Sequence, residues 1–245
     1  MHHDIKKFSK VAAQKANTTQ TGQTLLEVII AIGVITVGII GTIALVITST
    51  KAGNVSQNEL IATNLAREGI EVARSIRDNN WLAIEANTPG VTWDQDLFDP
   101  AAPGGGLAGF TAIPLFDADN NQWSLDFDAN DFITTCTDHT CTQVFRTQDQ
   151  LHQYADALPP GTSEVPFARL VTLRPICRDE NNAEALLEDS SKVCADLANQ
   201  NGLGAQVKKV GVEIESQVRY RVEQEEATYT LVDRVYNWKP GVVDE

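Results

Sequence analysis

The sequence predicts an α+β fold in which one long N-terminal α-helix packs on an antiparallel β-sheet. An uncharged apolar run at Val28–Ile47, a helical amphipathic pattern directly after it and strand-like alternation in the C-terminal half all support this fold. With 245 residues, the chain has room for this helix and one head domain. We therefore expect four parts: a leader at 1–22, a hydrophobic helix at 23–50, an amphipathic helix at 51–80 and a head at 81–245.

The polar leader 1–22 precedes the apolar run instead of containing it. An ordinary secretory signal has its cleavage site after an apolar core of ~7–15 residues. Here the cleavage-like residue, Gly22, comes before the run, so a cut at this point leaves the hydrophobic helix on the mature chain.

The run Val28–Ile47 contains no charged residue and no Asn, Gln or Pro. At ~1.5 Å per residue, a helix of about this length crosses the ~30 Å hydrocarbon core of a bilayer. Four lysines precede the run and only Lys51 follows it closely. The positive-inside rule then predicts a cytoplasmic N-terminus, with the head outside.

The residues Gly22–Ile30, GQTLLEVII, resemble the processing site of type IV prepilins and pseudopilins. That site has Gly, a variable residue, Thr, two aliphatic residues and Glu, and it opens a long apolar helix. The resemblance implies that a membrane prepilin peptidase cuts after Gly22 and that the new N-terminus, Gln23, is N-methylated. The first mature residue of the family is usually Phe, so Gln23 departs from the commonest pattern.

Glu27 is the single acid at the start of this apolar helix. A carboxylate is costly to bury in apolar surroundings unless it is paired. The resemblance implies that Glu27 pairs with the amine of Gln23 in a neighbouring subunit when the helices bundle in a filament. The alternative is a carboxylate that stays among the lipid headgroups, where the helix macrodipole favours it.

The segment 55–77 continues the helix with one apolar stripe, which predicts packing under the head. Its stripe consists of Ile61, Leu65, Val72 and Ile76. We expect the helix to run from about Leu25 to Asp78, where Asp78-Asn79-Asn80 ends it. Four glycines indicate either a segment that bends during assembly or close helix packing in a membrane: Gly33, Gly38, Gly41 and Gly53.

The remaining sequence predicts a mainly antiparallel head that begins with a loop at 81–109. Strands are expected at 110–116 and 123–128, which form a hairpin, and at 165–176, 207–222 and 227–238. An acidic insertion with a short helix is expected at 179–200.

Four cysteines on the outer side of the membrane predict disulfide bonds: Cys136, Cys141, Cys177 and Cys194. Of the three possible pairings we favour the local pairs, Cys136 with Cys141 and Cys177 with Cys194, because they close short loops. Zinc binding by Cys136, Cys141 and nearby histidines (His139, His152) is the less favoured alternative.

The segment Asp117–Asp128 spaces its oxygens like a calcium-binding EF-hand loop. Gln122 stands where such a loop needs Gly, and the flanks resemble strands, so an Asp/Asn-rich turn is the favoured interpretation. We therefore expect neither a metal nor another cofactor.

The net charge and the absence of catalytic motifs restrict the possible functions of the chain. The net charge is −14, and without the leader 15 basic and 32 acidic residues leave −17, which disfavours direct nucleic-acid binding. The sequence shows no catalytic motif, so we do not expect an enzyme. We expect a structural subunit, most like a minor pilin, of a type IV pilus or related filament. The alternatives are a pseudopilin of a type II secretion or DNA-uptake system, and a membrane-anchored surface ectodomain that binds or catalyses.

The resemblance also implies the partners and the location. The partners would be prepilin peptidase, other pilin subunits through the N-terminal helix, and the inner or cytoplasmic membrane before assembly. The chain would first be a single-pass membrane protein and then part of an extracellular filament or the cell surface.

Overall fold

The computed structural model describes residues 25–99, 108–117, 120, 122–127, 132, 142–147, 150–153, 160–222 and 225–238. The predicted cleavage site and the pair Cys136 and Cys141 lie outside these residues. The chain divides into two compact units, Met1–Ala52 and Gly53–Glu245.

The helix α1 (Leu25–Glu85) contributes residues to both units. In the first unit, every described residue of α1 is exposed. In the second unit, one face of α1 is buried, as the apolar stripe predicts: Ala62, Leu65, Ala66, Gly69, Ile70, Val72, Ala73, Ile76 and Trp81. The predicted amphipathic helix is thus confirmed, and its stripe faces the core of the head.

The helix continues past Asp78, so the predicted end at Asp78–Asn80 is wrong. Trp81 is 4% exposed and belongs to the main core cluster, so its burial favours another turn of helix. The helix ends instead at Glu85, and Asn87, two residues later, has a positive φ of 57°. There the Thr88 amide donates to the Ala83 carbonyl at 3.0 Å, a bond typical of a helix C-terminus.

The described part of the head contains an eight-stranded antiparallel sheet and two short 3₁₀ helices. The strands are β1 (Thr111–Asp117), β2 (Gln122–Asp126), β3 (Gln143–Thr147), β4 (Gln150–His152), β5 (Ser163–Asp179), β6 (Glu184–Leu186), β7 (Val207–Val222) and β8 (Glu225–Tyr236). The 3₁₀ helices are η1 (Ala108–Phe110) and η2 (Cys194–Leu197). The predicted hairpin corresponds to β1 and β2, and the other three predicted strands correspond to β5, β7 and β8.

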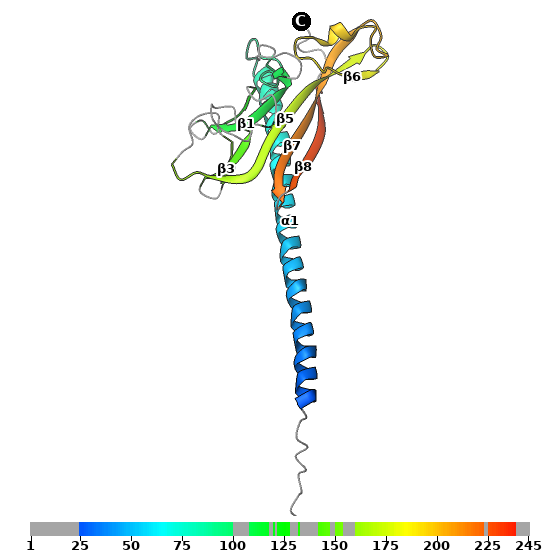
Figure 1. Ribbon diagram of the computed structural model, residues 1–245. Coiled ribbons are helices and arrows are strands. Elements are labelled where there is room, and N and C mark those ends of the chain that lie inside the picture. The colour runs from blue at the N-terminus through cyan, green and yellow to red at the C-terminus, as the bar shows by residue number, and fades with distance from the viewer. Residues whose placement is uncertain are drawn as a thin grey trace, which may run out of the picture. The chain divides into compact units, whose positions relative to one another are not determined.

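The strand β5 forms the centre of the sheet. One of its edges pairs along most of its length with β7, which in turn pairs with β8. The other edge pairs successively with β3, β1 and β6. In Figure 1 β5, β7 and β8 lie side by side, with the second half of α1 against one face of them.

The main core lies between α1 and this sheet. Val171 and Leu173 on β5 and Val212 and Ile214 on β7 are essentially inaccessible to solvent and pack with apolar residues of α1. The helix approaches the sheet closely at Gly69, where a Cβ atom would lie 2.5 Å from the Ser216 Oγ. Glycine is therefore required there for the observed helix–sheet distance.

Candidate functional site

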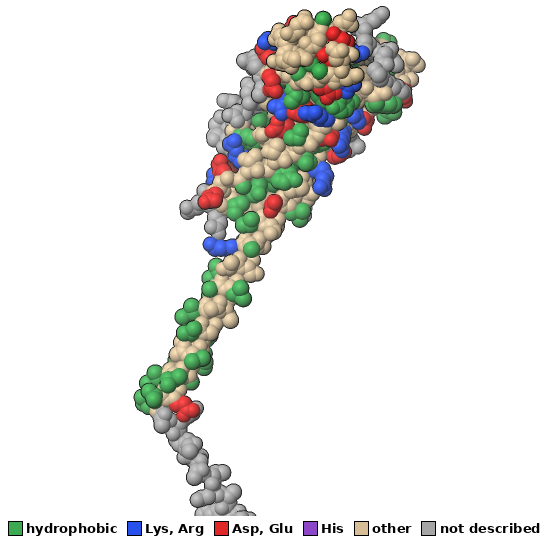
Figure 2. All heavy atoms as spheres, turned by 90° about the vertical axis from the view of Figure 1, so that its right-hand side faces the viewer, with side chains coloured by type: hydrophobic (Ala, Val, Ile, Leu, Met, Phe, Trp, Pro, Cys, Tyr) green, Lys and Arg blue, Asp and Glu red, His purple; other side chains and the backbone are tan. Residues whose placement is uncertain are grey.

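The first half of α1 presents an unbroken apolar surface. Fifteen large hydrophobic side chains between Leu25 and Ile47 are exposed by 42% to 79%. This helix is long and apolar enough to cross a membrane. Figure 2 shows hydrophobic side chains along it, and acidic side chains only near its described start. Soluble monomers rarely expose an apolar surface of this extent, so the segment requires a cover of lipid or other helices.

The threonine hydroxyls in this segment are satisfied within the helix. Four threonine hydroxyls donate to backbone carbonyls three or four residues earlier at 2.8–2.9 Å: Thr36, Thr42, Thr48 and Thr50. A hydroxyl without such an acceptor would cost free energy in hydrocarbon. These four threonines are therefore compatible with apolar surroundings.

Glu27 lies in the first turn of α1 and is exposed. The macrodipole at a helix N-terminus favours a carboxylate there. Its predicted partner, the Gln23 amine, belongs to a residue outside the described part of the chain, as does Gly22. Cleavage, methylation and the pairing of Glu27 accordingly stay predictions.

The predicted disulfide between Cys177 and Cys194 is confirmed, with the two Cα atoms 5.3 Å apart. It ties the end of β5 to η2 in the insertion 180–206, which also contains β6 and contributes Leu187 and Leu203 to a separate core cluster. The predicted short helix of this insertion corresponds to η2, while β6 was not predicted.

Two carboxylates hold the base of this insertion by accepting backbone amides. Asp179 accepts from Asn181, Ala183 and Gly204 at 2.7–2.9 Å. Desolvation by itself raises the pKa of Asp179, but these hydrogen bonds outweigh it and place the pKa below its ordinary value. Glu180 accepts from Ala205 and Gln206, and hydrogen bonds from backbone amides likewise lower its pKa.

A buried arginine on β5 links α1 to the sheet. Arg169 is 0% exposed, and its Nη1 donates to the Glu68 carboxylate at 2.9 Å and to the Leu65 carbonyl at 3.2 Å. Its Nε donates to the Gln153 Oε1 at 2.8 Å, and Gln153 in turn donates to the Thr142 carbonyl. Burial lowers the pKa of Arg169 from its ordinary value, and the Glu68 carboxylate opposes this effect.

The sequence prediction did not include Arg169, although the sequence holds a signal for it. Its neighbours on the same face of β5 alternate as Val165, Phe167, Val171 and Leu173, all of which are buried. An arginine within such a buried alternation indicates a buried charge, which needs a partner on the element that packs on that face.

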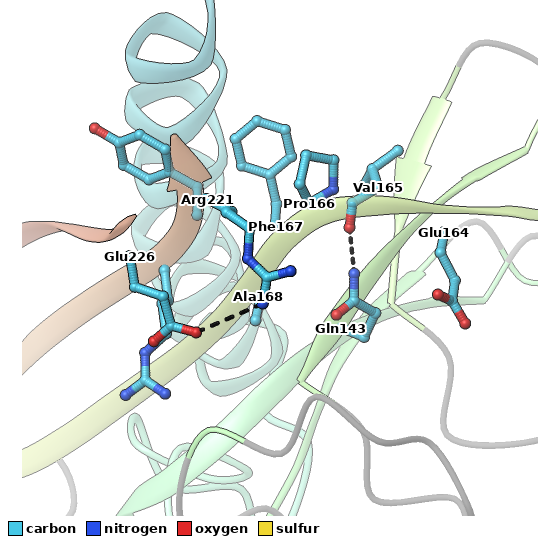
Figure 3. A pocket seen from close by; sticks show the side chains of 10 residues that line it. Gln143, Glu164, Val165, Pro166, Phe167, Ala168, Arg221 and Glu226 are labelled. Atoms are coloured by element: carbon cyan, nitrogen blue, oxygen red, sulfur yellow. Dashed lines mark hydrogen bonds and ion pairs between the residues drawn. The ribbon is translucent and has the colours of Figure 1, made fainter. Parts of the chain in front are cut away.

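A cavity of about 420 Å³ lies at the end of the sheet where β5 begins and β7 ends (Figure 3). There Gln143 donates to the Val165 carbonyl, and Arg221 lies 3.9 Å from the Glu226 carboxylate. The Arg219 guanidinium lies over the Phe132 ring, 4.2 Å from its centroid.

The two alternative metal sites gain no support from the described residues. The Asp117 carboxylate accepts from the Asn120 amide and side chain, as in an Asx-type turn, while Asp119, Asn121 and Asp128 lie outside the description. Among the zinc alternatives only His152 is described, and its ring stacks on Phe116. No group of three or more His, Cys, Asp or Glu within the described ranges is arranged to hold a metal ion.

No protein-family model, no curated protein and no solved structure matches this chain.

Proposed function

We propose that this chain is a structural subunit of a type IV pilus or a related filament, and that it matures by cleavage after Gly22. The first half of α1 holds the subunit in the membrane and later packs against the same segment of other subunits. Glu27 then pairs with the Gln23 amine of a neighbouring subunit.

The observation that carries the proposal is the exposed apolar surface between Leu25 and Ile47, which begins within the prepilin-like motif Gly22–Ile30. A simple membrane anchor needs such a surface but does not need the Gly22 motif in front of it. The motif and the surface together therefore favour a filament subunit over an ordinary anchored ectodomain.

The finer assignment to a minor pilin is supported by the head. The insertion 180–206 adds a disulfide-tied element that contributes to a separate core cluster beyond the main sheet. Such an addition suits a specialised subunit present in few copies better than one that must tile a whole filament. A pseudopilin shares the same maturation and is the alternative within the class.

Co-expression of the full chain with a prepilin peptidase tests the proposal. Mass spectrometry of the purified protein should find an N-terminus at Gln23 carrying one methyl group. A chain that keeps Met1 in the presence of an active peptidase would contradict the proposal and favour an anchored ectodomain. Recovery of the mature chain in filaments sheared from the cell surface would extend the result from maturation to assembly.

A further inference from the structure

The lysines of the head gather in one place. From Gly53 onward, the described part of the chain has three lysines, and Lys192, Lys208 and Lys209 all line the same groove. This lysine groove, of about 730 Å³, lies between the loop after α1 and the insertion 180–206. Phe98 and Leu187 provide part of its apolar lining.

The lysine groove differs in charge from the rest of the head. Its lining includes two acids, Asp94 and Asp96, and Asp189 lies beside Lys192, so the three lysines are balanced, 3 − 3 = 0. The chain from Gly53 onward has 14 basic and 31 acidic residues, which gives 14 − 31 = −17. The groove is thus a locally neutral region with three ammonium groups in a strongly acidic domain, and it repels anionic groups of a partner far less than the rest of the head does.

The ammonium groups in the lysine groove are only partly covered by their neighbours. Lys209 contacts the Asp94 carboxylate and lies 5.2 Å from the Phe98 ring centroid. The Lys192 Nζ lies 3.8 Å from the Asp189 carboxylate, and the Lys192 side chain is 56% exposed. Lys208 is also exposed, so two of the three ammonium groups are accessible to a partner.

The opposite end of the same strands exposes glutamates. Glu164 near the start of β5 and Glu225 and Glu226 at the start of β8 are all exposed. We call these three residues the acidic end. The nearby Arg221 is 66% exposed and only 3.9 Å from Glu226, a loose surface pair that costs little to exchange.

The two ends of one head cannot meet. The strand β7 begins in the lysine groove at Val207 and ends at Val222, beside the acidic end. Its 16 residues span about 50 Å at ~3.3 Å per residue. A glutamate of the acidic end can therefore enter the lysine groove only from another molecule.

We propose that the acidic end of one copy docks in the lysine groove of a second copy, so that heads stack end to end. Such a contact joins two different surfaces of the same chain, and its repetition gives an open chain of subunits, as a filament requires. The inference rests on the proposed filament function. Exposed ion pairs contribute little individually, so stacking becomes effective when assembly through α1 raises the local concentration of heads.

Cross-linking of the full chain in membranes tests this contact while leaving the charges intact. Gln95→Cys places a thiol in the lysine groove and Thr228→Cys places one near the acidic end, and both positions are exposed. With a short bismaleimide, the double variant should give a ladder of multimers. Co-expressed single variants should stop at dimers, and neither single variant alone should cross-link above the unmodified chain.

Charge reversal in the double-cysteine variant identifies the residues that attract one another. Lys208→Glu should lower the ladder yield at least fivefold, and Glu226→Lys added to it should restore the yield. Asp78→Lys, which reverses an exposed charge on α1 instead, is the matched control and should not restore it. The pairing would be overturned if Glu226→Lys and the control Asp78→Lys both restored the yield. It would also be overturned if Lys208→Glu left the yield unchanged.

The outcome separates this inference from the proposed function. Filaments with an N-terminus at Gln23 but no cross-linked ladder would overturn the stacking and leave the function standing. A ladder from a chain that keeps Met1 would support the stacking and contradict the function. Cross-linking within a single variant would also overturn the stacking, because it shows like ends in contact.

Discussion

Arg169 on β5 donates to the Glu68 carboxylate on α1 at 2.9 Å, and this pair joins the helix to the centre of the sheet. The arginine side chain is 0% exposed, whereas Glu68 is 36% exposed. The buried cation is therefore held by an anion at the rim and by neutral acceptors inside, the Leu65 carbonyl and Gln153. Its Nη2 has no hydrogen-bond partner among the described residues.

Arg169→Ala should destabilise the head by ~3–5 kcal/mol, because it leaves a cavity and removes the partner of Gln153. Arg169→Met should cost less, since it fills the space without burying a charge. Denaturant unfolding of the full chain in detergent, followed by tryptophan fluorescence, measures both losses. Equal losses for the two variants would contradict the cavity contribution, because both variants remove the charge and only Met fills the space.

Gly69→Ala should destabilise the head by ~1–3 kcal/mol, because the added Cβ would lie 2.5 Å from the Ser216 Oγ and must force the helix and sheet apart. Ser216→Ala in the same background should recover part of the loss by removing that oxygen. Ser216→Ala alone should be neutral or stabilising, since this buried hydroxyl has no hydrogen-bond partner among the described residues. Additive effects of the two changes in thermal unfolding would count against a direct clash.

Gly22→Ala should block maturation, because the prepilin-like motif places the cut after this residue. Mass spectrometry of the chain co-expressed with prepilin peptidase should then find the leader retained. Gln20→Ala, a change in the leader outside the motif, is the matched control and should mature normally. Cleavage of Gly22→Ala at the wild-type rate would show that the motif does not direct cleavage.

Glu27→Ala should leave cleavage intact and reduce incorporation into sheared filaments at least tenfold. The reason is that the Gln23 amine of a neighbour would lose its buried partner, at a cost of ~3–5 kcal/mol. Glu59→Ala changes another exposed glutamate of α1 and should be incorporated normally. Comparable incorporation of both variants would contradict the pairing role of Glu27.

Acid should loosen the base of the insertion 180–206 in the wild-type chain, whereas a variant without the Asp179 carboxylate should already be loose at neutral pH. The pKa of Asp179 in the folded head lies below its ordinary value of 3.8, so its ionised form stabilises the fold. This contribution is complete well above pH 3.8 and is lost as the pH falls through the folded-state pKa. The protection factor of the Gly204 amide, which corrects for the intrinsic pH dependence of hydrogen exchange, should therefore fall below that pH in the wild-type chain, whereas in Asp179→Asn it should already be low at pH 6.

Residue periodicity was sufficient to predict the long elements. The stripe containing Leu65 and Val72 predicted the buried face of α1, and alternation predicted β5, β7 and β8. The strands β3, β4 and β6 have only three to five residues, too few for a pattern. The strands β3 and β6 form on the free edge of β5, and β4 forms on β3. The helix end was misplaced because burial of Trp81 overrides the local signal of Asp78-Asn79-Asn80.

The candidate site was predicted in its local parts and missed in its long-range ones. Short loop length was enough to pair Cys177 with Cys194. The ion pair of Glu68 and Arg169 joins residues about a hundred positions apart in the sequence. No local sequence pattern specifies which acidic residue pairs with a buried arginine. Cleavage at Gly22 and the pairing of Cys136 with Cys141 stay predictions.

The threonine hydroxyls of the first half of α1 have a consequence for a helix that exchanges lipid for other helices, as the proposed function requires. Because Thr36, Thr42, Thr48 and Thr50 already donate within their own helix, their hydrogen bonds stay unchanged in either surroundings. For the apolar side chains only van der Waals contacts are exchanged, and these differ little between lipid chains and other helices. The free-energy difference that favours the bundle must then come from polar groups, such as the proposed pair of Glu27 with a neighbouring amine.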